Sequence, residues 1–126
     1  MRFTTLLLSC TILASCSMMS IDQMREALPP KTYTSEHSPE ALDECIVGVF
    51  NGNARGFEMI RFDGAKSYRQ GNRITITAIT GHPMYFLDIT PSGKDHIKSL
   101  IQERSLEHMP IGYLDRFQGL TKSCLR

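Results

Sequence analysis

The feature that most limits the fold of this chain is an uncharged apolar segment near its N-terminus. Arg2 supplies a positive charge, and residues 3–13 that follow it are apolar or small and carry no charge. A helix that crosses a membrane needs about 20 apolar residues, whereas the apolar core of an export signal has about 7–15 and follows a positive charge. The sequence therefore predicts a removable export signal, and only the residues after it are available for a folded domain.

The apolar segment ends in Leu13-Ala14-Ser15-Cys16. This sequence resembles the lipobox of bacterial lipoproteins, in which an aliphatic residue and two small residues precede a cysteine. The resemblance implies that Cys16 receives a diacylglyceryl group, that residues 1–15 are cleaved off, and that the new N-terminal amine is acylated. Two or three acyl chains anchor a protein durably, because each buried CH₂ contributes about 0.8 kcal/mol. The alternatives are an ordinary signal with an incidental cysteine, and lipidation at Cys10, before which the apolar run is too short.

The residue after this cysteine bears on the location of the anchor. Ser17 stands there, whereas an Asp at this position keeps enterobacterial lipoproteins in the inner membrane. The resemblance therefore implies a lipid anchor in the outer membrane, facing the periplasm, if the organism has one. It covers residues 1–16 and concerns processing, not activity.

The charges of the mature chain cancel. The chain has 14 Lys and Arg residues and 13 Asp and Glu residues, and removal of residues 1–15 takes away Arg2 alone. A neutral chain argues against nucleic acid or a polybasic contact with lipid as its main interaction. About 110 residues remain, which is enough for one small domain.

The cysteines predict one disulfide. After Cys10 and Cys16 are set aside, Cys45 and Cys124 are the two that remain, and in an oxidising envelope we expect them to pair. The closed loop of about 80 residues would contribute about 4.5 kcal/mol in the chain-entropy model. Two free thiols or a bridge between molecules are the alternatives. A metal site is not indicated, because there is no C-x-x-C motif and no nearby pair of histidines.

The chain divides at residue 37. Residues 16–37 contain two consecutive prolines and show no sustained period, so we expect a flexible tether with a root-mean-square span of about 25 Å. The alternative is a turn or two of helix with Ile21, Met24 and Leu28 on one side. Residues 38–126 are expected to form a small α+β domain.

A helix is expected at the start of this domain. Ser38 is a favourable N-cap and Pro39 suits the first helical position, while Gly52 is a stop signal. An apolar stripe at helical spacing runs between them, and it consists of Leu42, Cys45, Ile46, Val49 and Phe50. This pattern predicts a helix over residues 38–52 with Cys45 on its buried side.

The period then changes to that of strands. Asp63-Gly64 and Gly71-Asn72 are signals for two-residue turns, and Gly81-His82-Pro83 marks a third turn. The strands expected between them are 57–62, 65–70, 73–80 and 84–89. Helices are expected over residues 94–104 and after Pro110. The predicted architecture is an antiparallel meander of four strands with the N-terminal and C-terminal helices packed on one face.

The sequence offers no set of matched acid, base and nucleophile, so we expect no enzyme, no metal and no cofactor. Asp88 lies among apolar residues of a strand and is either partly buried or on an outward face. Arg69 and Arg73 flank the second turn, where both can reach solvent and bind a carboxylate or phosphate. Ordinary solvated charge is the alternative for these two arginines.

These observations lead to an expectation about function. The domain loosely resembles small proteobacterial or phage-borne lipoproteins with one long-range disulfide. We expect a noncatalytic envelope lipoprotein that binds another envelope component, with Arg69 and Arg73 as possible contacts. The alternative is an inhibitor, immunity or exclusion lipoprotein that acts on an envelope enzyme or an incoming phage.

Overall fold

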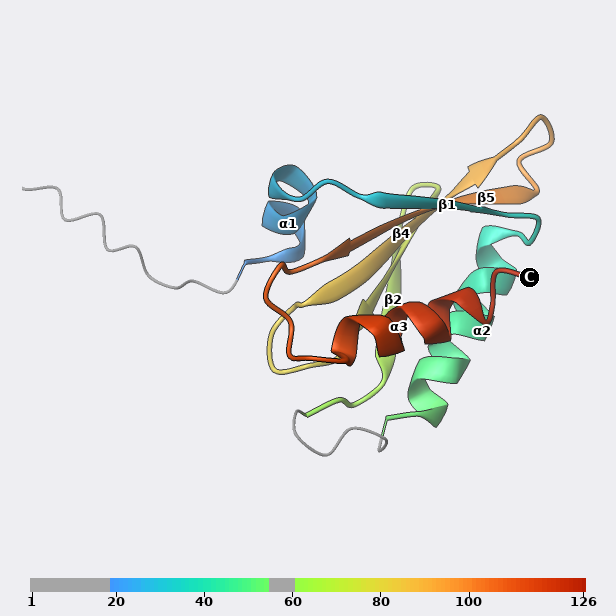
Figure 1. Cartoon of the computed structure of the whole chain (residues 1–126). Coiled ribbons are helices and arrows are strands. Elements are labelled where there is room, and N and C mark those ends of the chain that lie inside the picture. Colours follow the sequence, from blue (N-terminus) through green and yellow to red (C-terminus); the bar gives the residue numbers. More distant parts are fainter. Residues whose placement is uncertain (1–18, 55–60) are drawn as a thin grey trace, which may run out of the picture.

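The computed structural model describes residues 19–54 and 61–126, which form an α+β domain. Their sheet has five antiparallel strands in the order β1-β5-β4-β3-β2. Helices α2 and α3 cover one face of this sheet, and α1 lies on the other face (Figure 1). The elements are α1 (Ile21–Ala27), β1 (Lys31–Ser35), α2 (Pro39–Gly52), β2 (Ala65–Gln70), β3 (Arg73–Ala78), β4 (Tyr85–Ser92), β5 (Lys98–Ser105) and α3 (Tyr113–Lys122).

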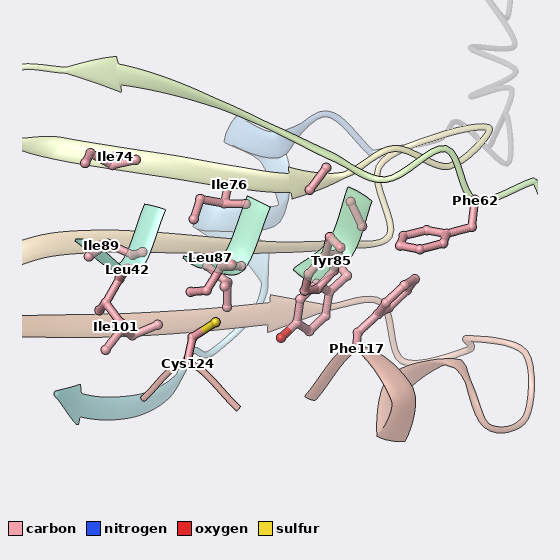
Figure 2. Packing of buried hydrophobic residues seen from close by; sticks show 14 of the residues in the cluster. Leu42, Phe62, Ile74, Ile76, Tyr85, Leu87, Ile89, Ile101, Phe117 and Cys124 are labelled. Atoms are coloured by element: carbon pink, nitrogen blue, oxygen red, sulfur yellow. The ribbon is translucent and has the colours of Figure 1, made fainter. Parts of the chain in front are cut away.

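The main core lies between the sheet and the helices α2 and α3 (Figure 2). Alternate residues of the central strands point into it, because successive side chains of a strand face opposite sides. Each fully buried apolar side chain contributes about 1.5–3 kcal/mol. The core includes Leu42, Ile46 and Phe50 from α2, Phe117 from α3, and Ile74, Ile76, Leu87, Ile89 and Ile101 from the sheet.

The helix α2 follows the prediction closely. It spans Pro39–Gly52, and the side chain of its N-cap Ser38 accepts a hydrogen bond from the backbone of Ala41. The expected buried position of Cys45 is wrong, because Cys45 is exposed and its disulfide partner Cys124 is buried.

The flexible tether predicted for residues 16–37 is wrong over residues 20–35. Ser20 and Gln23 form a capping box at the start of α1, and Met24 has no exposed surface. The strand β1 pairs with β5 along its whole length. These elements have seven and five residues, too few to show a period, and their stability comes from packing on the sheet. Residues 16–18 lie outside the described residues.

The helix predicted for residues 94–104 is also wrong. Its second half forms β5, in which Ile101 faces the main core while Gln102 lies opposite Asp88 on the other face. Its core-facing positions include the polar Ser99 and Glu103 beside Ile101, so β5 shows no apolar alternation. The spacing of Ile97, Leu100 and Ile101 imitates a helix instead. The helix expected after Pro110 is present as α3.

The strands expected at 65–70, 73–80 and 84–89 correspond to β2, β3 and β4. Asp63-Gly64 forms no hairpin: the backbone N–H of Asp63 donates to Ile79 and the N–H of Ile79 donates to Gly64, so that two residues oppose one, as in a bulge. Gly64 has a φ of 97°. The strand predicted at 57–62 falls mostly outside the described residues, and residues 61 and 62 are not in a strand.

The predicted disulfide is present. Cys45 of α2 is bonded to Cys124, two residues after α3, and the bridge spans 79 positions of sequence. It ties the C-terminal segment to α2 and closes most of the domain into one loop.

Replacement of both cysteines, Cys45→Ala with Cys124→Ala, should therefore destabilise the domain. Loss of a native disulfide from a small exported domain costs about 2–5 kcal/mol, so the melting temperature should fall by about 10 °C or more. Thermal unfolding followed by circular dichroism measures this. A reductant should lower the melting temperature of the wild type to that of the variant and leave the variant unchanged. Equal melting temperatures without reductant would contradict the stabilising role of the bridge.

Candidate functional site: two buried carboxylates and a cleft

Two carboxylates are buried on opposite faces of the sheet. Asp88 of β4 lies under α1, and Glu103 of β5 faces α3; each residue is 3% exposed. An ionised carboxylate inside a protein is costly unless charged or hydrogen-bonding groups compensate it. The surroundings of each acid therefore indicate its role.

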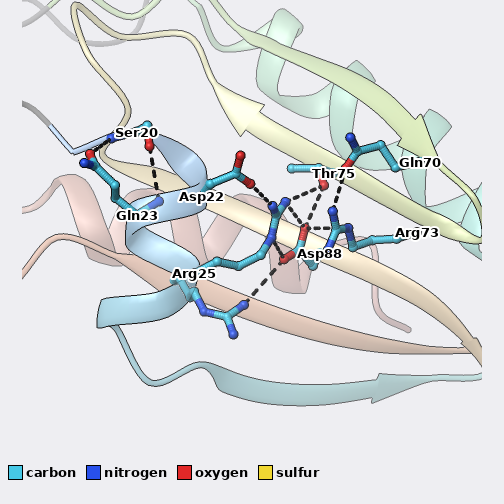
Figure 3. Close-up of polar contacts among 9 residues, drawn as sticks. Ser20, Asp22, Gln23, Arg25, Gln70, Arg73, Thr75 and Asp88 are labelled. Carbon is cyan, nitrogen blue, oxygen red and sulfur yellow. Dashed lines mark hydrogen bonds and ion pairs between the residues drawn. The ribbon is translucent and has the colours of Figure 1, made fainter.

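Asp88 is bound by the guanidinium of Arg25 through two parallel hydrogen bonds (Figure 3). Nε donates to Oδ2 at 2.7 Å, and Nη2 donates to Oδ1 at 2.9 Å. The hydroxyl of Thr75 also donates to Oδ1, at 2.7 Å. Such bidentate pairs combine charge with fixed geometry, so this contact fixes α1 on the second face of the sheet.

Two further arginines lie near the same carboxylate. Nη1 of Arg104 is 3.5 Å from Oδ2 of Asp88, and its Nε donates to the carbonyl of Leu28 after α1. Nε of Arg73 is 3.9 Å from Oδ1 of Asp88. Burial raises the pKa of Asp88, but the hydrogen bonds from Arg25 and Thr75 outweigh it, and the pKa is lowered. Asp88 is therefore an ionised anchor for α1 and is poorly suited to proton transfer.

Glu103 is held mainly by neutral donors. The hydroxyl of Tyr85 donates to Oε2 at 2.5 Å, and the side-chain amide of Gln118 donates to Oε1 at 2.7 Å. The hydroxyl of Tyr85 also contacts Thr121 at 2.9 Å. Burial, followed by the charge of Glu103, raises the pKa of Tyr85. The network joins α3 to the sheet, and Tyr85 stays protonated and donates a hydrogen bond to Glu103.

A cleft of about 330 Å³ opens beside Glu103, between the α1–β1 connection, the end of β5 and α3. Its walls are largely apolar, and its charged groups are two acids and one base. The lining residues are Leu28, Pro29, Lys31, Glu103, Ser105, Leu106, Glu107, Leu114 and Gln118. A cleft lined by apolar residues and two acids suits a short apolar segment that carries a hydrogen-bond donor or a positive charge.

The structure separates the two arginines that the sequence grouped at one turn. Arg69 pairs across β2 and β3 with Ile74, a core residue, and its Nη2 binds Glu40 of α2 at 2.6 Å. Arg73 points to the other face, where it approaches Asp88 and donates to Gln70. Arg69 and Arg73 therefore do not form one surface, although Arg69 stays half-exposed. Sequence reasoning found Asp88 but missed Arg25, Glu103 and the cleft.

Within residues 19–54 and 61–126, no group of His, Cys, Asp or Glu side chains is placed to hold a metal ion. The same part of the chain contains no helix that is long and apolar enough to cross a membrane. Cys16 lies outside these residues. Comparison with models of protein families, with curated proteins and with solved structures gives no match to this chain, so the site is interpreted from its own geometry.

The variant Asp88→Asn should detach α1 and destabilise the domain. Removing one partner of a buried pair leaves arginines without compensation and costs about 3 kcal/mol. Denaturant unfolding measures the loss, and hydrogen exchange should show reduced protection of the α1 amides. Asp22→Asn is the matched control, because Asp22 binds the same Arg25 at 2.7 Å but is 87% exposed. Its effect should stay within about 0.5 kcal/mol, and equal losses in both variants would contradict the role of Asp88.

Acid should remove the contribution of Asp88. Its pKa in the folded state lies below its ordinary value, which is about 3.9 in an unfolded chain. The stabilisation is therefore complete well above pH 3.9 and is lost as the pH falls through the lower folded-state pKa. Unfolding free energies of the wild type and Asp88→Asn should converge below about pH 3.9. A constant difference down to pH 2 would show that the charge of Asp88 is not its source.

Proposed function

We propose that the protein is an envelope lipoprotein, anchored through Cys16, whose domain binds another envelope component and catalyses no reaction. The observation that carries this proposal is the bridge between Cys45 and Cys124. Structural disulfides belong to oxidising compartments, and the same chain begins with an export-type segment that ends in the lipobox-like Leu13-Ala14-Ser15-Cys16. Export, lipidation and a disulfide-bridged domain are mutually consistent.

The cleft beside Glu103 is the surface we assign to the partner. Glu103 and Glu107 outnumber Lys31 around it, and Leu28 and Leu114 supply apolar walls. A partner segment with a Lys or Arg side chain and apolar neighbours would match both properties. The two buried carboxylates support binding over turnover, because each acid accepts hydrogen bonds from a helix and holds that helix on the sheet.

The inhibitor alternative rests on a different surface. The hairpin between β4 and β5 extends beyond the body of the sheet (Figure 1), and Ile97 near its tip is 60% exposed. A projecting hairpin with an apolar tip can enter the cleft of a target enzyme. This geometry favours an inhibitor or immunity role as the second candidate.

The anchor can be tested with Cys16→Ser. The variant should incorporate no radioactive palmitate in growing cells and should accumulate as the uncut precursor, because the thiol that accepts the lipid is missing. The wild type should be labelled and recovered with the membrane fraction. Unchanged labelling of the variant would overturn the assignment of Cys16.

The partner surface can be tested by photo-crosslinking in intact cells. The full lipoprotein would carry p-benzoylphenylalanine in place of Lys31 in the cleft, Ile97 at the hairpin tip, or Tyr68 on β2. We expect a specific protein adduct from position 31, none from position 68, and a several-fold lower yield when Glu107→Lys is added. Glu44→Lys, on an exposed position of α2, is the charge-matched control and should leave the yield unchanged.

The same experiment separates the two candidate functions. An adduct from position 97 in place of position 31, insensitive to Glu107→Lys, would favour the hairpin and the inhibitor role. The same adducts from all three positions would show that crosslinking is nonspecific and would remove support for the cleft.

A further inference from the structure

Three segments meet at one end of the domain, and we call this the anchor end. They are the start of α1, the β3–β4 connection at 79–84 and the β5–α3 connection at 106–112 (Figure 1). Ile21 of α1 lines a small hollow with residues 79–83. The backbone N–H of Leu106 donates to the carbonyl of Met84 at 2.9 Å. The three segments are therefore neighbours.

The start of α1 is only four residues from the cysteine that we propose to be lipidated. Four residues of fully extended chain reach about 14 Å at most from Cys16 to Ser20, compared with the span of about 25 Å expected for a tether of 21 residues. The helix cannot swing away to lengthen this reach, since Met24 is completely buried and Arg25 binds Asp88.

This reach brings the anchor end to the membrane surface. The polar headgroup layer is about 5–8 Å thick on each side of a bilayer, and a lipidated cysteine sits at its boundary with the acyl chains. A domain that begins within about 14 Å of that point lies against the headgroups. The anchor end, which carries Ser20 and Ile21, therefore faces the headgroups.

The most exposed large apolar side chain among the described residues is at this same end. Ile111 in the β5–α3 connection has 103% of its reference exposure and follows Met109 and Pro110. A single exposed isoleucine is common on protein surfaces. Ile111 is informative because it lies beside the anchor. Exposed charges of both signs lie in segments of the anchor end and next to it, including Asp22, Arg61, Asp63 and Glu107. The contact therefore needs no particular charge on the lipid.

We propose that the anchor end rests on the lipid bilayer and that Ile111 enters the membrane interface. The inference rests on the proposed lipidation of Cys16 and adds an orientation to it. An apolar side chain at the headgroup boundary is a second membrane contact besides the lipid on Cys16. Two contacts hold the domain in one orientation. The β4–β5 hairpin then points away from the membrane.

A pair of single labels tests the orientation. Lipoprotein carrying Ile111→Cys or Ile97→Cys would be labelled without reduction with the fluorophore NBD, so that the bridge between Cys45 and Cys124 stays closed. Ile97 is the matched control, because it is an exposed isoleucine at the opposite end of strands β4 and β5. The labelled proteins would be reconstituted in phosphatidylcholine vesicles with and without a lipid that carries a nitroxide on carbon 5 of its acyl chain.

We expect the nitroxide lipid to quench NBD at position 111 several-fold more strongly than at position 97. Equal quenching at both positions, or none at position 111, would overturn the inference. Flotation of the vesicles tests the anchor separately. Protein that floats but shows equal quenching contradicts the orientation alone, whereas protein that fails to float overturns the lipid anchor and this inference with it.

Discussion

The arrangement of residues 20–35 depends on the ion pair between Arg25 and Asp88. A helix of seven residues is marginal in water by itself, and Met24 is the one residue of α1 that is buried. Two parallel hydrogen bonds at 2.7 and 2.9 Å between the guanidinium and a carboxylate that is 3% exposed hold α1 on the sheet. Because of this pair the sheet is covered on both faces, and the chain enters β1 directly after α1.

The two buried acids each hold a helix, on opposite faces of the sheet, and their charges are compensated in different ways. Asp88 faces three arginines, so its charge is compensated by ions and its position is fixed by α1. Glu103 is compensated mainly by hydroxyl and amide donors, among them Tyr85 and Gln118. Its charge is therefore less compensated than that of Asp88, and Glu103 is the buried acid that lines the cleft. This difference is the physical reason for assigning a positively charged partner segment to the cleft.

The sequence predicted the elements whose stability is local. Ser38 and Pro39 mark the start of α2, and the β-branched residues of β3 mark a strand. The bridge spans 79 positions, and it was predictable because the two cysteines that remain can pair within the chain in one way. Sequence reasoning failed at the other contacts between distant residues. The edge strand β1 exists because β5 pairs with it, and β5 shows no strand period in sequence because its core-facing positions include the polar Ser99 and Glu103. Asp88 was recognised as an unusual strand residue, but Arg25 lies 63 positions away, and no local pattern connects them.

Coverage of both faces also limits where a partner can bind. Helix α1 occupies part of one face, α2 and α3 occupy the other, and β1 ends in a bond from Ser35 to Leu125 near the C-terminus. The cleft lies between the connection after α1 and the start of α3, beside the β5–α3 connection that carries Ile111. If the anchor end rests on the bilayer, a segment that enters the cleft must approach along the membrane surface. A partner that is itself held in the same membrane meets this requirement more readily than a freely diffusing one, since confinement to a shared surface raises its effective concentration.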